Sequence, residues 1–246
     1  MIVLLCLSAV FPVLMGTEVV NSNCFLATDC SDVYSSGKND SGVYTVSSID
    51  GPVQIYCDMI PSGENHSKGH WMVIVKRMDG EVNFFRPWDS YKRGFGNKEG
   101  EYWLGLEFIH LLTHRNRYKL RVDLEDFDGK KFYAVYESFS VDAESDGYKL
   151  HVSGFVNGGA GDSLTYHNQM KFSTFDKDQD NWKDGSCALT FSMGGFWYNN
   201  CHHTNPTGMY LWGKDDGSLS IGANWYTWTK NRKCLKAITW KITRVM

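Results

Sequence analysis

The chain has 246 residues, and its 25 Lys and Arg against 28 Asp and Glu give a formal net charge of −3. This balance excludes a nucleic-acid binder that depends on bulk positive charge. With 22% charged and 42% hydrophobic residues, disorder along the whole chain is excluded as well. Aromatic residues make up 15%, and there are 24 Gly but only 5 Pro, which favours a packed domain with β-structure and many tight turns.

The first segment indicates the compartment. Residues 1–16 contain no charged residue, and the apolar run 2–14 is too short to span a bilayer, which needs about 20 residues. The run is typical of the apolar region of a secretory signal peptide, although it lacks a basic n-region, and a buried N-terminal strand is the alternative. We predict a signal peptide over 1–16. No later stretch approaches the length of a membrane span, so we expect a secreted chain with no membrane span.

The cysteine count agrees with an extracellular compartment. Of seven cysteines, Cys6 lies in the predicted leader, and the six that remain are Cys24, Cys30, Cys57, Cys187, Cys201 and Cys234. An even number favours disulfides, and the absence of any CxxC pair argues against a zinc ribbon or a thioredoxin-like centre. Two sequons, at Asn39 and Asn65, lie in polar, turn-rich stretches and are predicted glycosylation sites.

The predicted elements follow a short lead-in over 17–29, which has no heptads and no Gly-X-Y period and so predicts no stalk. Alternating or apolar runs predict strands at 42–46, 53–57, 71–77, 118–124, 131–136 and 148–152. Asp79-Gly80 predicts a turn into a further strand at 82–85. Apolar spacing predicts a short helix over 106–113. The region as a whole predicts an antiparallel sheet with few helices.

The sequence pattern changes from about Gly154. Regular alternation fades, and Gly, Asn, Asp and Trp become dense as far as Trp228. Loops with so many aromatic residues are usually held by buried ring packing together with a disulfide or a metal. The final run, 235–242, alternates again, and we expect it to return to the central sheet as a strand.

Several motifs occur in an order that is characteristic of one family. They are DCSDV at 29–33, GVYTV at 42–46, VQIYCDM at 53–59, FG at 95–96, EYWLGLE at 101–107, LRVDL at 120–124 and FSTFDKDQD at 172–180, followed by Cys187 and Cys201-His202. Together they resemble the fibrinogen C-terminal domain family from about Cys30 to the C-terminus.

The resemblance implies an α+β fold with a central twisted antiparallel sheet, short helices and a loop-rich, calcium-binding C-terminal part. It also implies one domain over 30–246, with subdomains of about 30–75, 76–153 and 154–246. The expected activity is not catalytic. It is calcium-dependent, lectin-like binding of acetylated or related glycans on microbial or matrix surfaces by a secreted homo-oligomer.

The spacing of acidic residues supports a calcium loop. Asp176, Asp178 and Asp180 fall at every second position in a turn-rich segment, so their carboxylates can converge on one hard cation. An EF-hand is excluded because its sixth and twelfth positions, which need Gly and Glu, hold Asn181 and Cys187. The alternative is a solvated acidic turn.

The family resemblance makes the ligand set specific. It implies that Ca²⁺ is bound by the side chains of Asp178 and Asp180 and by the backbone carbonyls of Trp182 and Asp184. Before Cys187 the loop is one residue longer than the usual family spacing, so the second carbonyl could instead belong to Lys183 or Gly185.

A ligand site beside the calcium loop is also implied by the resemblance. The family has a disulfide that corresponds to Cys187–Cys201 and a cis peptide that corresponds to Asn200–Cys201. On this basis the backbone N–H groups of Asn200 and Cys201 would donate to a ligand's acetyl carbonyl, Phe191 would form a wall, and His202 would line the rim.

The sequence departs from the acetyl-binding members at two places. Leu219-Ser220 occupies the position of a pocket aromatic, and the basic run 229–233 lacks the tyrosine that follows the second tryptophan. We therefore expect an altered preference that tolerates anionic or sulfated glycans.

The family's other disulfide corresponds to Cys30–Cys57, which leaves Cys24 and Cys234. These two cysteines could pair with each other, or Cys24 could link two chains while Cys234 stays free.

Two other classes of function are possible readings of the sequence. An enzyme finds little support, because no Gly-x-Ser-x-Gly, His-Glu-x-x-His or Walker-type sequence occurs. An extracellular-matrix structural protein of microfibrils or elastic fibres, acting by protein contacts, is the main alternative to a lectin. The Arg-Gly-Asp tripeptide does not occur, so integrin-type adhesion through it has no support.

Overall fold

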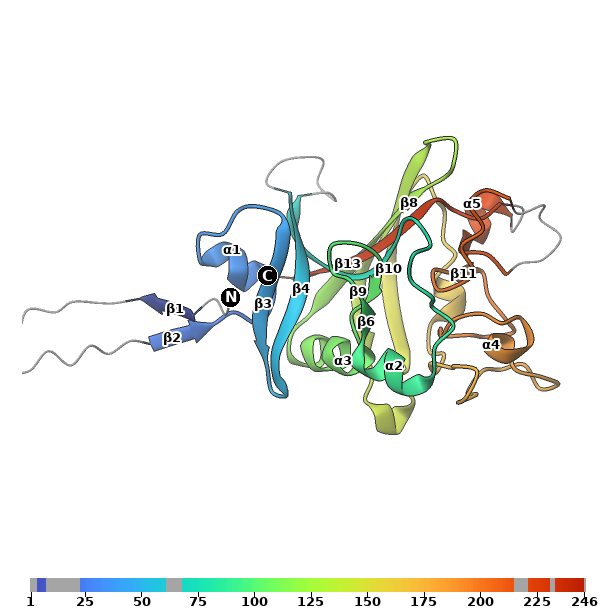
Figure 1. Ribbon diagram of the computed structural model, residues 1–246, viewed down its shortest axis with the longest axis horizontal. Helices are drawn as coiled ribbons and strands as arrows, with labels where there is room; N and C mark the ends of the chain where they lie inside the picture. The colour runs from blue at the N-terminus through green and yellow to red at the C-terminus, as the bar shows by residue number, and fades with distance from the viewer. Residues whose placement is uncertain (1–3, 8–22, 61–67, 215–220, 231–232, 246) are drawn as a thin grey trace, which may run out of the picture.

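The computed structural model describes residues 4–7, 23–60, 68–214, 221–230 and 233–245, and its centre is one large sheet (Figure 1). The main strands are β3 (Gly42–Ser48), β4 (Gly51–Ile60), β5 (Gly69–Arg77), β8 (Tyr118–Glu125), β9 (Lys131–Val141), β10 (Leu150–Gly158) and β13 (Ala237–Arg244). They are antiparallel in the order β10-β9-β8-β13-β5-β4-β3. The short strands β6 (Phe95–Gly96) and β7 (Tyr102–Trp103) attach to β5 through β7. The expected α+β architecture with an antiparallel sheet is confirmed.

The last strand occupies the middle of this sheet. β13 lies between β8 and β5, with Trp240 opposite Val122 on one side and Val75 on the other. The expectation that the final alternating run returns to the central sheet is therefore confirmed. Ile238, Trp240 and Ile242 are fully buried and belong to the hydrophobic core, which explains the alternation: the intervening side chains, including the buried Lys241 and Thr243, point to the other face of the sheet.

The sequence prediction identified one of three early helices. The helix predicted over 106–113 is α3 (Leu106–Arg115), whose apolar face is buried. Two shorter helices, α1 (Cys30–Ser35) and α2 (Trp88–Arg93), were not predicted. Both carry recognisable end signals: the side chain of Asp29 caps α1, and α2 follows Pro87.

The strand predicted at 82–85 is wrong. This segment has no strand partner in the structure; its first N–H, that of Val82, and the N–H groups of the turn before it donate to the buried carboxylate of Glu101, and the N–H of Phe85 donates to Asn83 Oδ1. Glu101 Oε1 accepts hydrogen bonds from the N–H groups of Met78, Asp79 and Gly80, and Oε2 accepts one from Val82. The N–H groups of Val82 and Phe85 thus donate to side chains and not to a neighbouring strand.

The core is unusually aromatic. Five tryptophans are fully buried: Trp71, Trp103, Trp197, Trp225 and Trp240. The rings of Trp197 and Trp240 are nearly parallel, with centroids 6.2 Å apart, so the C-terminal strand is packed directly against the region that precedes Cys201. The high aromatic content therefore serves the packing of loops onto the sheet.

The remaining elements are short. They are β1 (Leu4–Leu7), β2 (Asn23–Leu26), η1 (Glu144–Asp146), η2 (Thr165–His167), α4 (Cys187–Thr190), β11 (Thr204–Asn205), β12 (Asn224–Trp225) and α5 (Tyr226–Thr229). Figure 1 shows α4, β11 and α5 at the end of the molecule opposite β3 and β4. β1 pairs with β2 outside the main sheet. Most of the predicted signal peptide lies outside the described residues.

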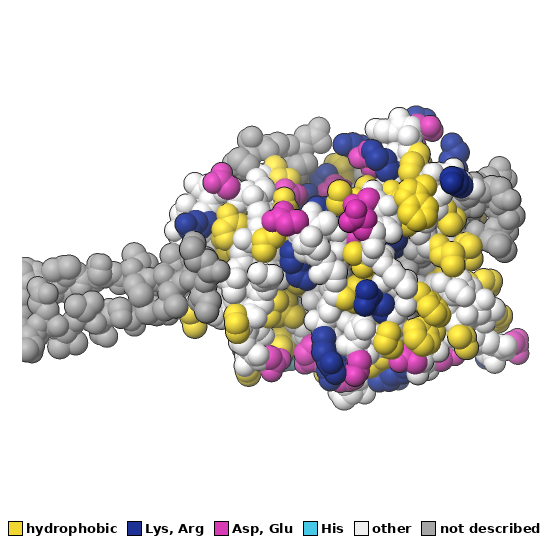
Figure 2. Space-filling model, in the orientation of Figure 1, with side chains coloured by type: hydrophobic (Ala, Val, Ile, Leu, Met, Phe, Trp, Pro, Cys, Tyr) yellow, Lys and Arg dark blue, Asp and Glu magenta, His cyan; other side chains and the backbone are white. Residues whose placement is uncertain are grey.

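The described residues contain no helix that is long and apolar enough to cross a membrane. On the face shown in Figure 2, basic and acidic side chains are interspersed among hydrophobic ones. That face carries no continuous basic stripe of the kind that tracks a nucleic-acid backbone.

Candidate functional site

The three aspartates of the acidic loop do not share one role. Asp176 Oδ1 accepts hydrogen bonds from the N–H of Trp88 at 2.9 Å and from the hydroxyl of Thr174 at 2.7 Å. Because Trp88 begins α2, Asp176 anchors the start of that helix. Asp176 therefore has a structural role at the start of α2, and the family resemblance assigns the cation to the other two carboxylates, those of Asp178 and Asp180.

Asp180 is held firmly in the loop. Its carboxylate oxygens accept hydrogen bonds from the backbone N–H groups of Trp182 at 2.8 Å and Cys187 at 2.7 Å. Burial raises the pKa of Asp180; the two N–H groups oppose this rise and the neighbouring Asp178 adds to it. Two neighbouring carboxylates on a curled loop repel each other, and a bound cation would relieve this repulsion.

The donor chemistry of the loop suits Ca²⁺. Carboxylates and carbonyls are the oxygen ligands that this hard cation prefers. Within the described chain the carbonyl of Asp184 accepts no hydrogen bond, and that of Trp182 accepts one long bond, 3.4 Å from the N–H of Gly185. No three His, Cys, Asp or Glu side chains in the described ranges gather as a metal site, so carbonyls and water would have to complete the coordination begun by Asp178 and Asp180.

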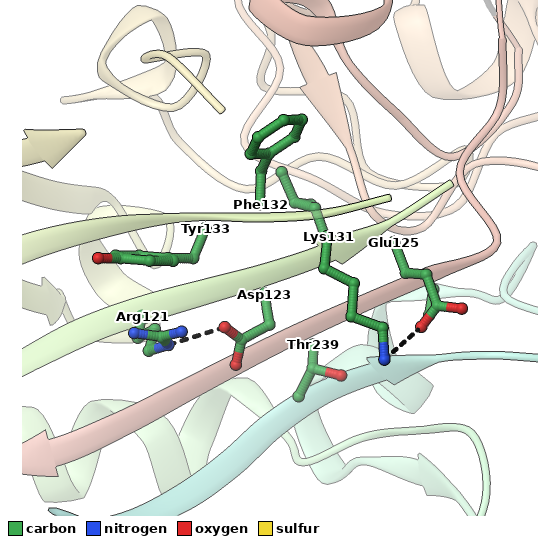
Figure 3. A pocket seen from close by; sticks show the side chains of 9 residues that line it. Arg121, Asp123, Glu125, Lys131, Phe132, Tyr133 and Thr239 are labelled. Carbon is green, nitrogen blue, oxygen red and sulfur yellow. Dashed lines mark hydrogen bonds and ion pairs between the residues drawn. The ribbon is translucent and has the colours of Figure 1, made fainter. Parts of the chain in front are cut away.

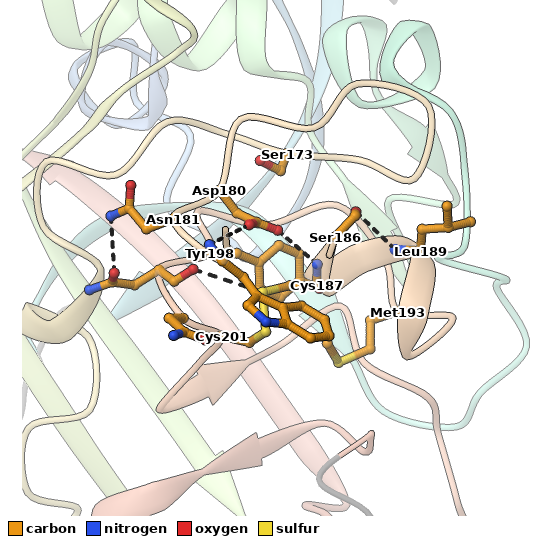
Figure 4. Close-up of a disulfide and its surroundings, with 12 residues drawn as sticks. Ser173, Asp180, Asn181, Ser186, Cys187, Leu189, Met193, Tyr198 and Cys201 are labelled. Carbon is orange, nitrogen blue, oxygen red and sulfur yellow. Dashed lines mark hydrogen bonds between the residues drawn. A yellow bond between two sulfur atoms is a disulfide. The ribbon is translucent and has the colours of Figure 1, made fainter. Parts of the chain in front are cut away.

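Two asparagines join the acidic loop to the loop before Cys201. The N–H of Asn181 donates to the carbonyl of Asn199 at 3.1 Å, and the side-chain amide of Asn181 donates to Asn199 Oδ1 at 3.0 Å. The amide of Asn199 in turn donates to the carbonyl of Tyr166 at 3.2 Å. The Cys187–Cys201 disulfide ties the same two loops covalently, and Figure 4 shows it beside Asp180 and Asn181.

The peptide bond between Asn200 and Cys201 is cis. The carbonyl of Asn200 accepts a hydrogen bond from the Tyr166 hydroxyl at 3.0 Å, and the carbonyl of Cys201 accepts one from the N–H of Asn199 at 2.8 Å. Both acceptors are thereby satisfied. In contrast, neither the N–H of Asn200 nor that of Cys201 donates to any described residue, so two consecutive backbone donors remain available to a ligand.

The two ring-bearing residues of the predicted ligand site, Phe191 and His202, each contact another aromatic ring. Phe191 is exposed and lies nearly parallel to Trp182, with ring centroids 5.8 Å apart. His202 is partly buried, and its ring meets that of Tyr198 edge-on. The structure therefore places Phe191 on the acidic loop's own tryptophan, and His202 directly after the cis peptide.

A buried histidine that the sequence reasoning missed supports the loop from beneath. His167 Nδ1 donates to the carbonyl of Trp197 at 2.7 Å, which makes Nε2 the acceptor for the N–H groups of His203 at 3.1 Å and Thr204 at 3.3 Å. Complete burial lowers the pKa of His167 to about 3. No sequence motif marks this role, because the groups involved lie 30 or more residues away from His167 along the chain.

His203 is a structural residue as well. Its ring is stacked between Tyr166, with centroids 3.8 Å apart, and Tyr226, with centroids 5.0 Å apart. Burial lowers the pKa of His203. The two adjacent histidines therefore differ: His203 is held by ring stacking, whereas His202 follows the cis peptide.

Comparison with known proteins identifies the family. The protein-family model for the C-terminal globular domain of fibrinogen beta and gamma chains matches residues 26–244. The chain belongs to the fibrinogen C-terminal domain family. Its sequence is 46% identical over 243 residues to "Microfibril-associated glycoprotein 4" of Bos taurus, covering 95% of this chain and 92% of the relative. The human counterpart is 48% identical over 223 residues, covering 88% and 84%.

Other fibrinogen C-terminal domains show the same similarity. "Fibrinogen C domain-containing protein 1-B" of Xenopus laevis is 47% identical over 221 residues, covering 87% of this chain but 46% of that longer protein. The fibrinogen-like globe domain of human ANGPTL6 superposes with a TM-score of 0.81 at 38% identity, covering 89% of this chain and 96% of that one. A lamprey fibrin D-dimer complexed with the peptide ligand Gly-His-Arg-Pro-amide has a TM-score of 0.78 at 36% identity, covering 87% of this chain and 72% of that one.

The disulfides of this fibrinogen C-terminal domain match the predicted pairs. Cys30 is bonded to Cys57, and Cys187 to Cys201. Cys234 is a buried free thiol. Of the two alternatives, a disulfide with Cys24 or a free Cys234, the structure has the free thiol. The side chain of Cys24 lies outside the described part, and its partner stays a prediction.

Of the other predicted site residues, some lie among the described residues and some do not. Asn39 is exposed, as a glycosylation acceptor must be. Asn65 and the substituted pocket positions Leu219 and Ser220 lie outside the described residues. These positions therefore remain predictions.

A separate hollow of about 350 Å³ lies on the open face of β8, β9 and β13 (Figure 3). Its charges are paired: Arg121 contacts Asp123 at 2.7 Å, and Lys131 contacts Glu125 at 3.3 Å. The guanidinium of Arg121 also lies 3.9 Å from the centroid of the Tyr133 ring. None of the four residues of the candidate ligand site lines this hollow.

Proposed function

We propose that this fibrinogen C-terminal domain is a secreted, calcium-dependent recognition protein that binds acetylated or related glycans. The observation that carries the proposal is the pair of free backbone donors at Asn200 and Cys201. Two adjacent N–H groups can hold one carbonyl oxygen, and an acetyl group offers such an oxygen next to a methyl group. The exposed ring of Phe191 supplies an apolar wall for the methyl group.

Calcium has a positioning role in this proposal. Asp178 and Asp180, with the carbonyls of Trp182 and Asp184, would hold the ion. Because Asn181 and the Cys187–Cys201 disulfide connect this loop to the cis peptide, an ion bound there would fix the donor geometry without contacting the ligand. This proposed function requires no covalent chemistry and is therefore not enzymatic.

Glycan-array binding with saturating calcium, and again after chelation with EGTA, tests the proposal. We expect binding to acetylated or sulfated glycans that is lost with EGTA and restored by added calcium. Asp178→Ala and Asp180→Ala should abolish the signal, whereas Asp184→Ala is the matched control. Asp184 carries the same charge in the same loop but would contribute only its carbonyl, so its variant should bind like the parent. Equal signal with and without calcium would refute the proposal.

A matrix role is the second candidate, and the similarity to proteins named microfibril-associated glycoproteins favours it. In that role the protein would sit in the extracellular matrix and bind components of microfibrils or elastic fibres by protein contacts, as a homo-oligomer. Binding of the Asp180→Ala variant to immobilised elastic-fibre proteins separates the two roles. Retained matrix binding with lost glycan binding would show that the two surfaces are distinct.

A further inference from the structure

A second possible ligand site lies far along the chain from the cis peptide, where α3 packs beside β9 (Figure 1). A hollow of about 310 Å³ is lined there by His110 and His114 of α3 and by Asp142 and Asp146, which lie between β9 and β10. The lining thus combines two imidazoles with two carboxylates. Neither the calcium loop nor the proposed glycan site uses any of these residues.

The two histidines are spaced for chelation. They stand four residues apart in one helix, so both side chains leave the same face, and their ring centroids are 5.6 Å apart. This is the spacing of the two zinc ligands in a helical His-Glu-x-x-His motif. Here the position of the glutamate is occupied by Leu111. The general base of that motif is absent, and the arrangement favours metal binding rather than hydrolysis.

The hydrogen bonding of His110 prepares it as a ligand. Its Nδ1 lies 2.9 Å from the carbonyl of Val141, and a carbonyl can only accept, so Nδ1 carries the proton. Nε2 of the neutral ring is therefore the atom with the free lone pair. Metal-binding histidines commonly donate their other ring N–H to a backbone carbonyl in this way, which fixes the tautomer and the ring orientation.

The carboxylates differ in availability. Asp142 is engaged with His151, whose Nε2 lies 2.8 Å from its Oδ2. Asp146 is exposed and accepts a hydrogen bond only from the exposed hydroxyl of its neighbour Ser145 among the described groups. In the described chain no three such side chains are already gathered around one point. Asp146 would therefore have to rotate inwards to become a third ligand.

From these observations we propose that His110 and His114 form a binding site for a borderline divalent transition-metal ion of the zinc class. The two imidazole nitrogens bind the ion, and Asp146 and water complete the coordination. Imidazole ligands favour Zn²⁺, Ni²⁺ and Cu²⁺ over Ca²⁺ and Mg²⁺, which prefer oxygen. The site is consequently independent of the proposed calcium loop.

Titration of the full chain with Zn²⁺ in saturating calcium, followed by calorimetry and by NMR of the histidine side-chain nitrogens, tests this site. We expect Zn²⁺ to shift the signals of His110 and His114 first. His114→Gln, at an exposed position that leaves the helix intact, should weaken binding by at least about tenfold. Asp146→Asn should weaken it less. His70→Gln, which removes a histidine stacked on Tyr34 away from this hollow, is the matched control and should leave binding unchanged.

Three outcomes would overturn the proposal: no uptake of Zn²⁺, unchanged affinity in His114→Gln, or first shifts at histidines other than His110 and His114. A circular-dichroism spectrum of His114→Gln that matches the parent excludes misfolding as the cause of lost binding. Calcium-dependent glycan binding should be the same in His114→Gln and in the parent. This last comparison keeps the result separate from the test of the calcium loop.

Discussion

Asn181 and Asn199 form a double bridge: backbone N–H to carbonyl at 3.1 Å and side-chain amide to amide oxygen at 3.0 Å. The bridge joins the acidic loop to the residue directly before the cis peptide. A change in the conformation of one of these loops, such as that caused by ion binding, is therefore expected to change the conformation of the other.

Replacing Asn199 should separate the two loops. Asn199→Ala removes the side-chain bonds to Asn181 and Tyr166 and should cost about 1–2 kcal/mol in the free energy of unfolding, measured by chemical denaturation. Calcium affinity and glycan affinity should both fall in this variant. Asn200→Ala is the control, because the exposed Asn200 would contribute its backbone. Unchanged calcium affinity in Asn199→Ala would contradict the coupling.

Calcium should stabilise the folded chain. A ligand at 100 times its Kd raises the free energy of unfolding by about 2.7 kcal/mol, so the melting temperature should rise as calcium is added. Asp178→Ala and Asp180→Ala should abolish this rise, whereas Asp184→Ala should retain it. Thermal denaturation monitored by tryptophan fluorescence measures the effect. A calcium-dependent rise that survives in both of the first two variants would place the ion elsewhere.

The buried His167 predicts a loss of stability in acid. Its pKa is about 3 in the folded chain, and near 6.5 when unfolded, so between these values the unfolded state binds the extra proton. Stability should therefore fall as the pH drops below about 6.5, by up to about 1.4 kcal/mol per pH unit from this residue. His167→Gln should flatten that slope while lowering stability at neutral pH.

Two measurements check the behaviour of His167. Denaturation of parent and variant between neutral pH and pH 5 gives the difference in slope. NMR of the native parent gives a direct reading: the His167 ring signals should stay in the neutral form across that range. A His167 ring that titrates near pH 6 in the folded protein would contradict the predicted lowering of its pKa.

The buried pair of Arg77 and Glu101 should be essential to stability. The guanidinium lies 3.2 Å from Glu101 and also donates to the carbonyls of Pro206 and Gly208 at 2.9 and 2.8 Å. Burial would raise the pKa of Glu101, but Arg77 and the surrounding N–H groups outweigh it and lower the pKa. Glu101→Gln leaves a buried charge uncompensated and should cost about 3–5 kcal/mol.

A surface pair provides the control for this prediction. Arg93 and Asp89 are in contact at 3.0 Å but largely exposed, so Arg93→Ala should change stability by less than about 1 kcal/mol. Urea denaturation of both variants makes the comparison. A similar cost for the two substitutions would show that burial does not govern the Arg77–Glu101 pair.

The sequence predicted the features that depend on local patterns. The alternation at 235–242 and the spacing of Leu106, Ile109 and Leu112 gave the last strand and α3, because burial of one face imposes a period. It failed at 82–85, where the N–H groups of Val82 and Phe85 donate to the side chains of Glu101 and Asn83. α1 and α2 are each six residues long, too short for a helical period to be clear.

In the candidate site, too, the features with a local sequence pattern were predicted and those that depend on distant contacts were not. The family motifs located the acidic loop and the disulfide, since both lie within one continuous stretch of chain. They did not reveal Asn199 and Tyr166 as connectors, or His167 as the support of the following loop. These roles arise from contacts across 18 to 37 residues, for which a single sequence carries no local signal.

The central position of β13 has a consequence for biosynthesis. Strands β3–β5 and strands β8–β10 emerge from the ribosome first, but each group keeps an open inner edge until residues 237–244 insert between them. Unpaired edges are liable to pair with other chains. The sheet therefore cannot be completed before residues 237–244 have been synthesised, and the solubility of the nascent domain until then depends on how quickly this strand inserts.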